Sequence, residues 1–295
     1  MAVTPPVSPP IVLTIAGFDP SSGAGVTADL KTIAAHECYG VSCITALTVQ
    51  STRGVRRVEA VDPQLIAETL EELATDLTVD AVHIGMLGNE QVVSAVAYFL
   101  GHAFTGKSSP PHVVLDPILK SSSGTDLLNE EGTRSLIERL LPLAEVVTPN
   151  LVEAAALTGR AVTNLEQMRD AATRLHVMGA ANVVVTGGDM EKATDLLSFT
   201  TGRGIETEIF KADRQKSNST HGTGCAFSTA LACHLAHGRG LPEAVLLSKA
   251  YVSAAIANAH PLGHGVGPLH HLYRMNQQRR ATTVVSEKET SHSRN

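Results

Sequence analysis

The chain has 295 residues, 43% of them hydrophobic, a formal net charge of −6 and an isoelectric point of about 6.1. It lacks tryptophan and contains only 3% aromatic residues, so we expect neither a basic face nor a set of stacking side chains for nucleic acid. No apolar run reaches about 18 residues, and the proline-rich N-terminal residues lack the charged and apolar regions of a signal peptide. We therefore expect a cytoplasmic protein without a membrane span, whose four cysteines are free thiols.

Short apolar segments alternate along the chain with segments of helical period. The expected strands, in chain order, are 11–17, 41–49, 81–86, 113–115, 145–148, 182–186, and a hairpin of 196–200 and 205–211 that turns at 202–204. The expected helices are 26–36, 63–75, 90–100, 129–141, 151–157, 165–178, 225–236 and 242–258. This alternation predicts mainly parallel strands covered by helices on both faces. We expect one domain over 11–276, a flexible arm over 1–10 and a disordered tail over 277–295.

Polar residues or glycines follow most of these strands. The carboxyl ends of parallel strands meet at one rim of a sheet, where ligands bind. We expect the following residues to converge there: Gly17, Asp19, Gln50, Gly85, Met86, Asp116, Asn150, Gly187 and Gly188. This convergence, more than any single motif, indicates an active site.

The glycine-rich loop 17–25 (GFDPSSGAG) matches neither the dinucleotide-binding pattern nor the P-loop. Its glycines allow a small ligand to lie against the backbone. Asp29, early in the next helix, is a candidate acceptor for that ligand, although a carboxylate near a helix N-terminus needs no ligand to explain it. Gln50 offers a donor and an acceptor together, which suits the edge of an aminopyrimidine. Met86 suits either an aromatic ligand or the core.

Asp116 ends one strand, and the N-x-x-E pair Asn150 and Glu153 follows another. Their oxygens are the hard ligands that Mg²⁺ prefers, with water and phosphate completing its shell. Taken alone, Asn150 and Glu153 are better explained as a helix cap. Together with Asp116 and the anion cradle at 222–225, they favour phosphoryl transfer.

The anion cradle consists of Gly222, Thr223, Gly224 and Cys225, where a polar loop runs into a helix of small residues. The free N–H groups at a helix start and two glycines suit a phosphate or an oxyanion. A thiol in the first helical turn tends to have a lowered pKa, which makes Cys225 a candidate base. The alternative is an ordinary turn with a small buried cysteine.

Thirteen histidines raise the question of a metal site. His260 and His264, and the pair His270 and His271, lie near glycines and prolines without the spacing of a histidine or cysteine metal site. We therefore expect histidines at the surface.

Residues 11–274 resemble the hydroxymethylpyrimidine/phosphomethylpyrimidine kinases of thiamine biosynthesis, a branch of the ribokinase-like superfamily. The matching segments are TIAGFDPSSGAGVTADLKT (14–32), ITALTVQST (44–52), IGML (84–87), VVLDPIL (113–119), TPNLVEAAAL (148–157), STHGTGCAFSTALA (219–232) and GVGPLHH (265–271). The resemblance implies a three-layer α/β/α ribokinase-like fold with a mainly parallel central sheet. It also implies ATP and Mg²⁺, two successive phosphorylations of 4-amino-5-hydroxymethyl-2-methylpyrimidine, and a homodimer, because dimers are common among such kinases.

The resemblance also assigns roles to residues. It places Gly17, Asp29, Gln50, Met86 and Ile118 in the pyrimidine pocket, and Asp116, Asn150 and Glu153 at the phosphates, with Asp116 and Glu153 holding Mg²⁺ mainly through water and phosphate. Gly222, Thr223 and Gly224 form the anion hole, Cys225 is the catalytic base, and Lys120, Thr186 and Gly188 lie on the ATP side.

Two positions depart from the family pattern as we know it. Phe18 stands where a small residue is expected. Thr186 stands where many members have a lysine, so the charge that such a lysine supplies is missing unless Lys120 provides it.

Two other functions remain open from the residues. The same superfamily includes kinases of vitamin B6 alcohols, which the segment THGTGC does not exclude. A binding or regulatory protein without catalysis is the other alternative, and the intact residues of the cradle and the N-x-x-E pair argue against it.

Overall fold

The computed structural model describes residues 8–107, 109–121, 123–188 and 190–275, so the predicted tail and most of the N-terminal arm lie outside it. In the described part, nine strands form one sheet in the order β3-β2-β1-β4-β5-β6-β7-β8-β9. The strands are β1 (Ile11–Phe18), β2 (Tyr39–Ser51), β3 (Gly54–Ala60), β4 (Ala81–Ile84), β5 (His112–Leu115), β6 (Val146–Val147), β7 (Val183–Val185), β8 (Ala193–Thr201) and β9 (Gly204–Ala212). Strands β2, β1, β4, β5, β6 and β7 run parallel, whereas β3, β8 and β9 pair antiparallel at the two sides.

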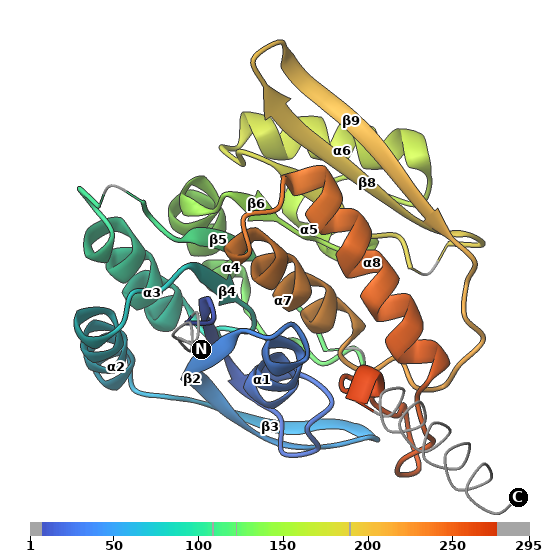
Figure 1. The fold of residues 1–295 in the computed structure, drawn as a ribbon, viewed down its shortest axis with the longest axis horizontal. Helices are drawn as coiled ribbons and strands as arrows, with labels where there is room; N and C mark the ends of the chain where they lie inside the picture. The colour runs from blue at the N-terminus through green and yellow to red at the C-terminus, as the bar shows by residue number, and fades with distance from the viewer. Residues whose placement is uncertain (1–7, 108, 122, 189, 276–295) are drawn as a thin grey trace, which may run out of the picture.

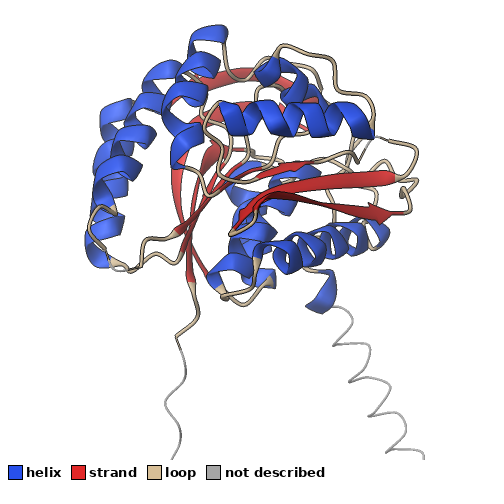
Figure 2. Cartoon of the chain, turned by 90° about the horizontal axis from the view of Figure 1, so that it is seen from above, coloured by secondary structure: helices blue, strands red, loops and turns tan. Residues whose placement is uncertain are grey.

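Helices cover both faces of the sheet (Figures 1 and 2). One face carries α1 (Gly25–Ala35), α7 (Thr223–Ala236) and α8 (Leu241–Ala257), which share one apolar core with the sheet. The other face carries α2 (Pro63–Asp76), α3 (Glu90–Ala103), α4 (Glu130–Ser135), α5 (Leu151–Thr158) and α6 (Leu165–Val177) over a second core. The predicted three-layer α/β/α architecture with a mainly parallel central sheet is confirmed.

Helix α7 lies across the centre of the sheet, packed on β1, β4 and β5. Every side chain from Cys225 to Leu235 is buried. The run is rich in alanine and other small residues, which allows a helix to approach a sheet closely on one side and two helices on the other. The N-terminus of α7 therefore starts at the rim where the parallel strands end.

Two expectations about secondary structure were wrong. Residues Gly54–Ala60 form a strand, β3, that was not predicted, and β2 extends to Ser51, so Gln50 lies inside the strand rather than after it. Three of the seven residues of β3 are charged, and two of them, Arg56 and Arg57, are adjacent, which interrupts the alternation that marks a strand. The predicted helix 129–141 breaks after α4 into a π-helical turn, Leu136–Leu140, and a 3₁₀ turn, Leu141–Leu143, because Pro142 lacks the N–H group that would continue an α-helix.

The hairpin of β8 and β9 was predicted correctly but is longer than expected, with its turn at Gly204 in the left-handed region. Among the described helices, none is long and apolar enough to cross a membrane.

Candidate active site

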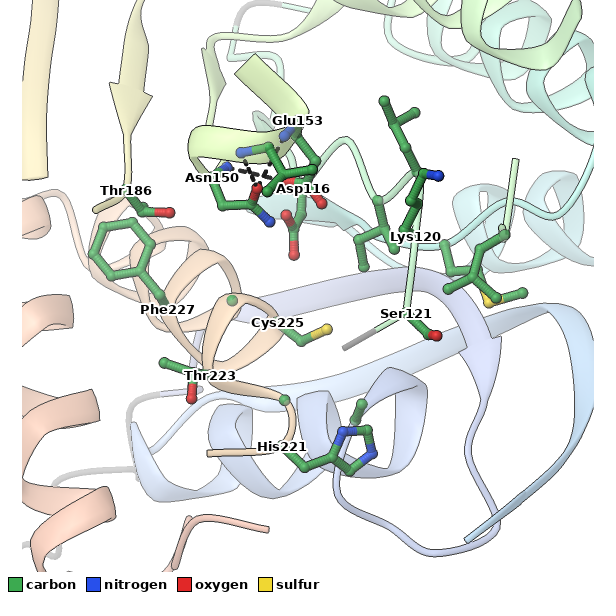
Figure 3. Close-up of a pocket in the computed structure, with 18 of the residues that line it drawn as sticks. Asp116, Lys120, Ser121, Asn150, Glu153, Thr186, His221, Thr223, Cys225 and Phe227 are labelled. Carbon is green, nitrogen blue, oxygen red and sulfur yellow. Dashed lines mark hydrogen bonds between the residues drawn. The ribbon is translucent and has the colours of Figure 1, made fainter. Parts of the chain in front are cut away.

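Most of the residues expected at the rim line one cavity of about 1730 Å³, whereas Gly85 and Gly187 do not. The cavity extends from Gly17 and Gln50, past the N-terminus of α7, to Thr186 and Lys249. A pocket for one drug-sized ligand measures about 300–1,000 Å³, so this cavity has room for two ligands. Figure 3 shows the middle of the cavity, where Asp116, Asn150, Glu153 and Cys225 lie close together.

The cradle residues Gly222, Thr223, Gly224 and Cys225 all lie on the cavity wall. Gly222 caps α7 with φ of 81°, and any side chain there would collide with the carbonyl oxygen of Gly23. Glycine is therefore required for two glycine-rich loops to meet. The arrangement leaves the first turn of α7 facing the cavity, with the positive end of its dipole toward a bound anion.

Cys225 is placed as predicted, but the expected direction of its pKa was wrong. The side chain is only 8% exposed. Burial first, then the carboxylates of Asp116 and Asp29, raise the pKa of the Cys225 thiol well above its ordinary value. The helix dipole is worth too little to overcome the loss of water and two nearby negative charges. In the ligand-free protein, Cys225 is a neutral thiol.

Asp116 follows β5 and lies beside the first turn of α7 (Figure 3). Its Oδ2 atom is buried and has no hydrogen-bond partner among the described residues. Burial, followed by the neighbouring carboxylates of Glu153 and Asp29, raises the pKa of Asp116 well above its ordinary value. A buried acid without donors is costly in the ligand-free protein and points to a ligand that supplies positive charge or donors.

Asn150 and Glu153 form the helix cap that was the simpler interpretation of their spacing. Asn150 Oδ1 accepts the backbone N–H groups of Val152 and Glu153 at 2.9 Å each, and Glu153 Oε2 accepts that of Asn150 at 2.9 Å. Burial nevertheless outweighs these hydrogen bonds and raises the pKa of Glu153 to about 7. The cap therefore holds an acid of raised pKa next to Asp116, so capping and ligand binding are compatible.

Gly17, Gln50, Met86 and Ile118 line the end of the cavity near β2 and β3. A Cβ atom at Gly17 would lie 2.9 Å from the Met86 sulfur, so the glycine lets Met86 occupy the wall. Phe18 lines the same cavity.

Asp29, by contrast, does not line the cavity and is corrected to a core residue. It is fully buried and accepts hydrogen bonds from the hydroxyls of Thr14 at 2.7 Å and Thr229 at 2.9 Å. Asp29 lies one turn into α1, and its side chain points toward the sheet. Its two hydrogen bonds therefore link α1 to β1 and to α7.

Thr186 and Gly188 lie at the other end of the cavity, after β7, where Thr186 donates its backbone N–H to Pro149 O at 2.9 Å. Lys120 also lies on the cavity wall. Its ammonium pairs with Asp126 at 2.8 Å, and both side chains are more than half exposed. Lys120 is thus a solvated, paired charge rather than a buried replacement for a lysine at position 186.

Two pairings of residues in the cavity wall were missed by sequence reasoning, although Asp19 itself was expected at the rim. Lys249 Nζ on α8 donates to Asp195 Oδ2 at 2.7 Å, and Asp195 Oδ1 accepts the N–H of Gly187 at 3.1 Å. His221 contacts Asp19 at 2.8 Å across 202 positions of sequence. A signal existed for the first pair, since Lys249 is the one charged residue in the apolar stretch 244–257.

The expectation that the histidines lie at the surface was also wrong for several of them. His36, His83, His221, His234 and His271 are buried. No group of three or more possible metal ligands was found among histidine, cysteine and acidic side chains of the described residues. Packing inside the two cores, rather than metal binding, accounts for most of these rings.

Comparisons with known proteins agree on one family. The family model described as phosphomethylpyrimidine kinase matches residues 19–270. A hydroxymethylpyrimidine/phosphomethylpyrimidine kinase of Rhizobium meliloti is 44% identical over 269 residues, which cover 90% of this chain and 97% of that protein. The thiamine biosynthesis bifunctional protein ThiED of Geobacter sulfurreducens is 42% identical over 263 residues, but the match spans only 52% of that longer protein.

Two solved structures show the same architecture. A pyridoxal kinase of Bacillus subtilis, in complex with ADP, has a TM-score of 0.80 at 33% identity and covers 91% of this chain and 100% of that chain. A phosphomethylpyrimidine kinase of Clostridium difficile has a TM-score of 0.73 at 35% identity. The match covers 84% of this chain and 99% of that chain.

Proposed function

The chain belongs to the phosphomethylpyrimidine kinase family, and from that membership we propose how its cavity carries out two successive phosphorylations. It is a hydroxymethylpyrimidine/phosphomethylpyrimidine kinase of thiamine biosynthesis that uses ATP. The observation that supports the proposed mechanism is a single cavity with a ring-reading amide, Gln50, at one end and the unpaired acid Asp116 further along it.

In the first reaction, the hydroxymethyl oxygen of the pyrimidine attacks the γ-phosphorus of ATP. A new O–P bond forms, the bond between the γ-phosphorus and the β–γ bridging oxygen breaks, and ADP leaves. In the second reaction, a phosphate oxygen of the monophosphate attacks another γ-phosphorus and forms a diphosphate. Positioning and charge neutralisation dominate such transfers.

The residues of the cradle supply the positioning. The start of α7 directs backbone N–H groups toward the transferred phosphoryl group. Cys225 lies beside it and is proposed to take the proton of the hydroxymethyl group. Because the pKa of its thiol is raised, Cys225 must first lose its own proton to solvent, and the minor thiolate form then takes the hydroxymethyl proton as the oxygen forms its bond to phosphorus.

The carboxylate oxygens of Asp116 and Glu153 are suitable ligands for Mg²⁺. Asp116 has a buried oxygen without a partner, and Glu153 lies beside it with a pKa of about 7. We propose that both hold the ion mainly through water and phosphate oxygens, as a hard cation prefers. When bound, Mg²⁺ neutralises charge on the phosphates.

The ATP end is proposed to lie between Thr186, Gly188 and Lys249. Gly188 faces open space, so backbone can approach a ligand there without obstruction. Lys249 and Asp195 anchor the preceding turn through Gly187. The buried ammonium group of Lys249 therefore lies at the proposed ATP end, where the lysine that many family members carry at position 186 is replaced by Thr186.

We also propose a homodimer. Leu47 and Val49 are half exposed and alternate along β2 with the cavity residues Thr48 and Gln50, so they point away from the cavity. Light scattering of the protein should give twice the chain mass, and Leu47→Asp with Val49→Asp should give the monomer.

A kinase for vitamin B6 is the second candidate, because the pyridoxal kinase of B. subtilis shares the fold closely. The assay that separates the two uses Mg·ATP with three acceptors, namely the hydroxymethylpyrimidine, its monophosphate and pyridoxal, with products identified by mass spectrometry. We expect both pyrimidines to be phosphorylated and pyridoxal to have a kcat/KM at least about tenfold lower. A protein that leaves the monophosphate unchanged is not bifunctional, and one that prefers pyridoxal is a vitamin B6 kinase.

A further inference from the structure

A short glycine-rich segment after α8, residues 263–267 (GHGVG), crosses the turn between β2 and β3, and we call it the strap. The backbone N–H of Val266 donates to Thr52 O at 2.9 Å. The N–H of Gly265 donates to Thr52 Oγ1 at 3.3 Å. Thr52 directly follows β2 and lies two positions after Gln50. The strap is therefore fixed to the β2–β3 hairpin that carries Gln50.

The same strap is bound to the loop before the anion cradle. Gly267 donates its N–H to Asn218 O at 2.8 Å, and His221 donates its backbone N–H to Gly267 O at 3.0 Å. His221 directly precedes Gly222, the first residue of the cradle. Backbone hydrogen bonds on both sides of the strap therefore connect the β2–β3 hairpin with the cradle loop, two segments that are far apart in the sequence.

The strap can lie this close to the hairpin because residue 265 is a glycine. A Cβ atom at this position would collide with the carbonyl group of Thr52 and would lie 2.9 Å from the Cα atom of Arg53. Both obstacles are backbone atoms, which cannot rotate away as the end of a flexible side chain can. Any side chain at position 265 must therefore push the strap away from the hairpin.

Val266 is the strap residue that lines the cavity, and it is 42% exposed. Its hydrogen bond to Thr52 places it at the end of the cavity where Gln50 lies. The cavity wall also includes the apolar residues Val55 and Met86. A half-exposed apolar side chain at a cavity wall is stabilised when a ligand covers it, because apolar area leaves water. An aromatic ring that is held at its edge by Gln50 offers such a cover.

We propose that Val266, held in place by the strap, is a further substrate-binding residue that packs on the ring of the pyrimidine and shields it from water. Gln50 then supplies the polar contacts to the edge of the ring, and Val266 supplies an apolar contact to its surface. Because the strap is also bound to the cradle loop, the ring is held at a fixed position relative to the phosphate site. This inference rests on the proposed function and specifies how that site holds its substrate.

The test measures binding of 4-amino-5-hydroxymethyl-2-methylpyrimidine by calorimetry without ATP, so that the result does not depend on turnover. Val266→Ala removes the proposed contact, Val266→Ile preserves it, and Gly265→Ala displaces the strap. Leu262→Ala is the matched control for a side chain, because Leu262 is 57% exposed next to the strap but does not line the cavity. Gly240→Ala is the matched control for a glycine, because a Cβ atom there would meet no atom within 4 Å.

Val266→Ala should bind the pyrimidine on the order of fivefold more weakly than the wild type, because the contact loses the methyl groups of the valine. Val266→Ile and both controls should bind within about twofold of the wild type. The melting temperature of Val266→Ala should stay at the wild-type value, because a half-exposed side chain contributes little to the core. Wild-type affinity in Val266→Ala, or an equal loss in Leu262→Ala, would overturn the inference.

The double variant Gly265→Ala with Val266→Ala tests the role of the strap. Gly265→Ala alone should weaken binding about fivefold or more. Adding Val266→Ala should weaken it by less than about twofold further, because Val266 has already lost its position. Losses that multiply would show that Val266 does not depend on the strap and would overturn the inference. If Gly265→Ala does not fold, the comparison of Val266→Ala with Val266→Ile and Leu262→Ala decides the contact by itself.

The proposed function can fail independently of this inference. A wild type that binds the pyrimidine but does not phosphorylate it with Mg·ATP would count against the proposed function alone. A wild type that binds pyridoxal instead of the pyrimidine would also count against the proposed function. In that case the affinity of Val266→Ala for pyridoxal decides the inference, which a fivefold loss supports and an unchanged affinity overturns.

Discussion

Asp19 and Asp116 both follow a parallel strand at the same rim and are almost equally buried, at 3% and 4% exposed. Asp19 accepts hydrogen bonds from a histidine, a hydroxyl and three backbone N–H groups. Asp116 keeps a buried oxygen with no partner, next to a second acid, Glu153. The hydrogen bonds of Asp19, at the end of the cavity proposed to bind the pyrimidine, are therefore satisfied without a ligand, whereas those of Asp116, at the proposed phosphate end, are not.

This difference in hydrogen bonding distinguishes buried acids that stabilise the fold from buried acids that gain their partners when a ligand binds. A satisfied carboxylate stabilises the loop around it, and its loss costs stability. An unsatisfied one destabilises the ligand-free protein and gains its partners on binding. Substitutions at the two kinds of site should thus change stability in opposite directions.

The largest effect is expected for Asp116→Asn. Turnover should fall about 10³-fold, because charge stabilisation at the transferring phosphate is lost. The melting temperature of the ligand-free protein should rise by a few degrees, since the amide replaces a buried acid whose Oδ2 has no partner and which repels the neighbouring acids. A coupled kinase assay and a thermal melt of the same preparation measure both.

Asp29→Asn is the control for this prediction, because Asp29 is buried but accepts from two hydroxyls. It should lower the melting temperature, at a cost of about 1–3 kcal/mol. A fall in melting temperature for Asp116→Asn as well would contradict the comparison.

Stability should also respond to pH through Glu153. Its folded pKa of about 7 lies above the ordinary glutamate value, so the folded state binds more protons than the unfolded state between the two values. The free energy of unfolding of the ligand-free protein should therefore decrease from about pH 4.5 to 7 through this group, relative to Glu153→Gln. Urea denaturation of both proteins across this range measures the difference, and parallel pH profiles would contradict it.

Cys225→Ala should lower turnover about 10²-fold while pyrimidine binding survives. Because the pKa of this thiol is raised, its ionised fraction still grows with pH in mildly alkaline solution. The kcat/KM of the wild type should therefore keep rising above about pH 8, and the variant should lack that rise. Equal turnover in both proteins, or a flat wild-type profile, would remove Cys225 from the role of base.

Lys249→Met tests the buried ion pair at the ATP end. Removing one partner leaves Asp195 unpaired and should cost about 3 kcal/mol of stability. The KM for ATP should rise about tenfold, because Asp195, which accepts the Gly187 N–H, loses the cation that holds its carboxylate in place. Adding Asp195→Leu should recover stability without recovering the KM, since the apolar pair repacks but cannot hold the Gly187 N–H. Recovery of both would show that the pair serves stability alone.

The smallest effect is expected for Gln50→Ala. It should raise the KM for the pyrimidine about tenfold and leave that for ATP unchanged. Steady-state kinetics with each substrate varied in turn separates the two. A change confined to the KM for ATP would place Gln50 at the wrong end of the cavity.

Local patterns were sufficient to predict most of the fold. The strands β4, β5 and β7 are short, mainly apolar runs, with one histidine each in β4 and β5, as is typical of strands covered on both faces. Strand β3 was missed because half of its residues face water, and the helix 129–141 was predicted too long because its apolar period continues through a π turn.

The site was harder to predict because its contacts join distant residues. Gln50, Asp116 and Cys225, which all line the cavity, were proposed from expected strand ends and a helix start, which are local signals, although Gln50 in fact lies within β2. The partners of Asp19 and Asp195 come from α7 and α8, far along the chain, and only the fold brings them together. The pKa of Cys225 depends on the acids of other elements, so position in a helix alone predicted the wrong direction.

The number of protons released when Mg·ATP binds is the most direct test of the proposal that Asp116 and Glu153 lack a cationic partner until a ligand binds. Calorimetric titrations near pH 7, in two buffers of different ionisation enthalpy, give the number of protons released. The account predicts a net release of protons, because the raised pKa values of Asp116 and Glu153 fall beside a cation, and no release in the double variant Asp116→Asn with Glu153→Gln. Equal binding enthalpies in both buffers for the wild type would show that these acids are already ionised and would contradict the account.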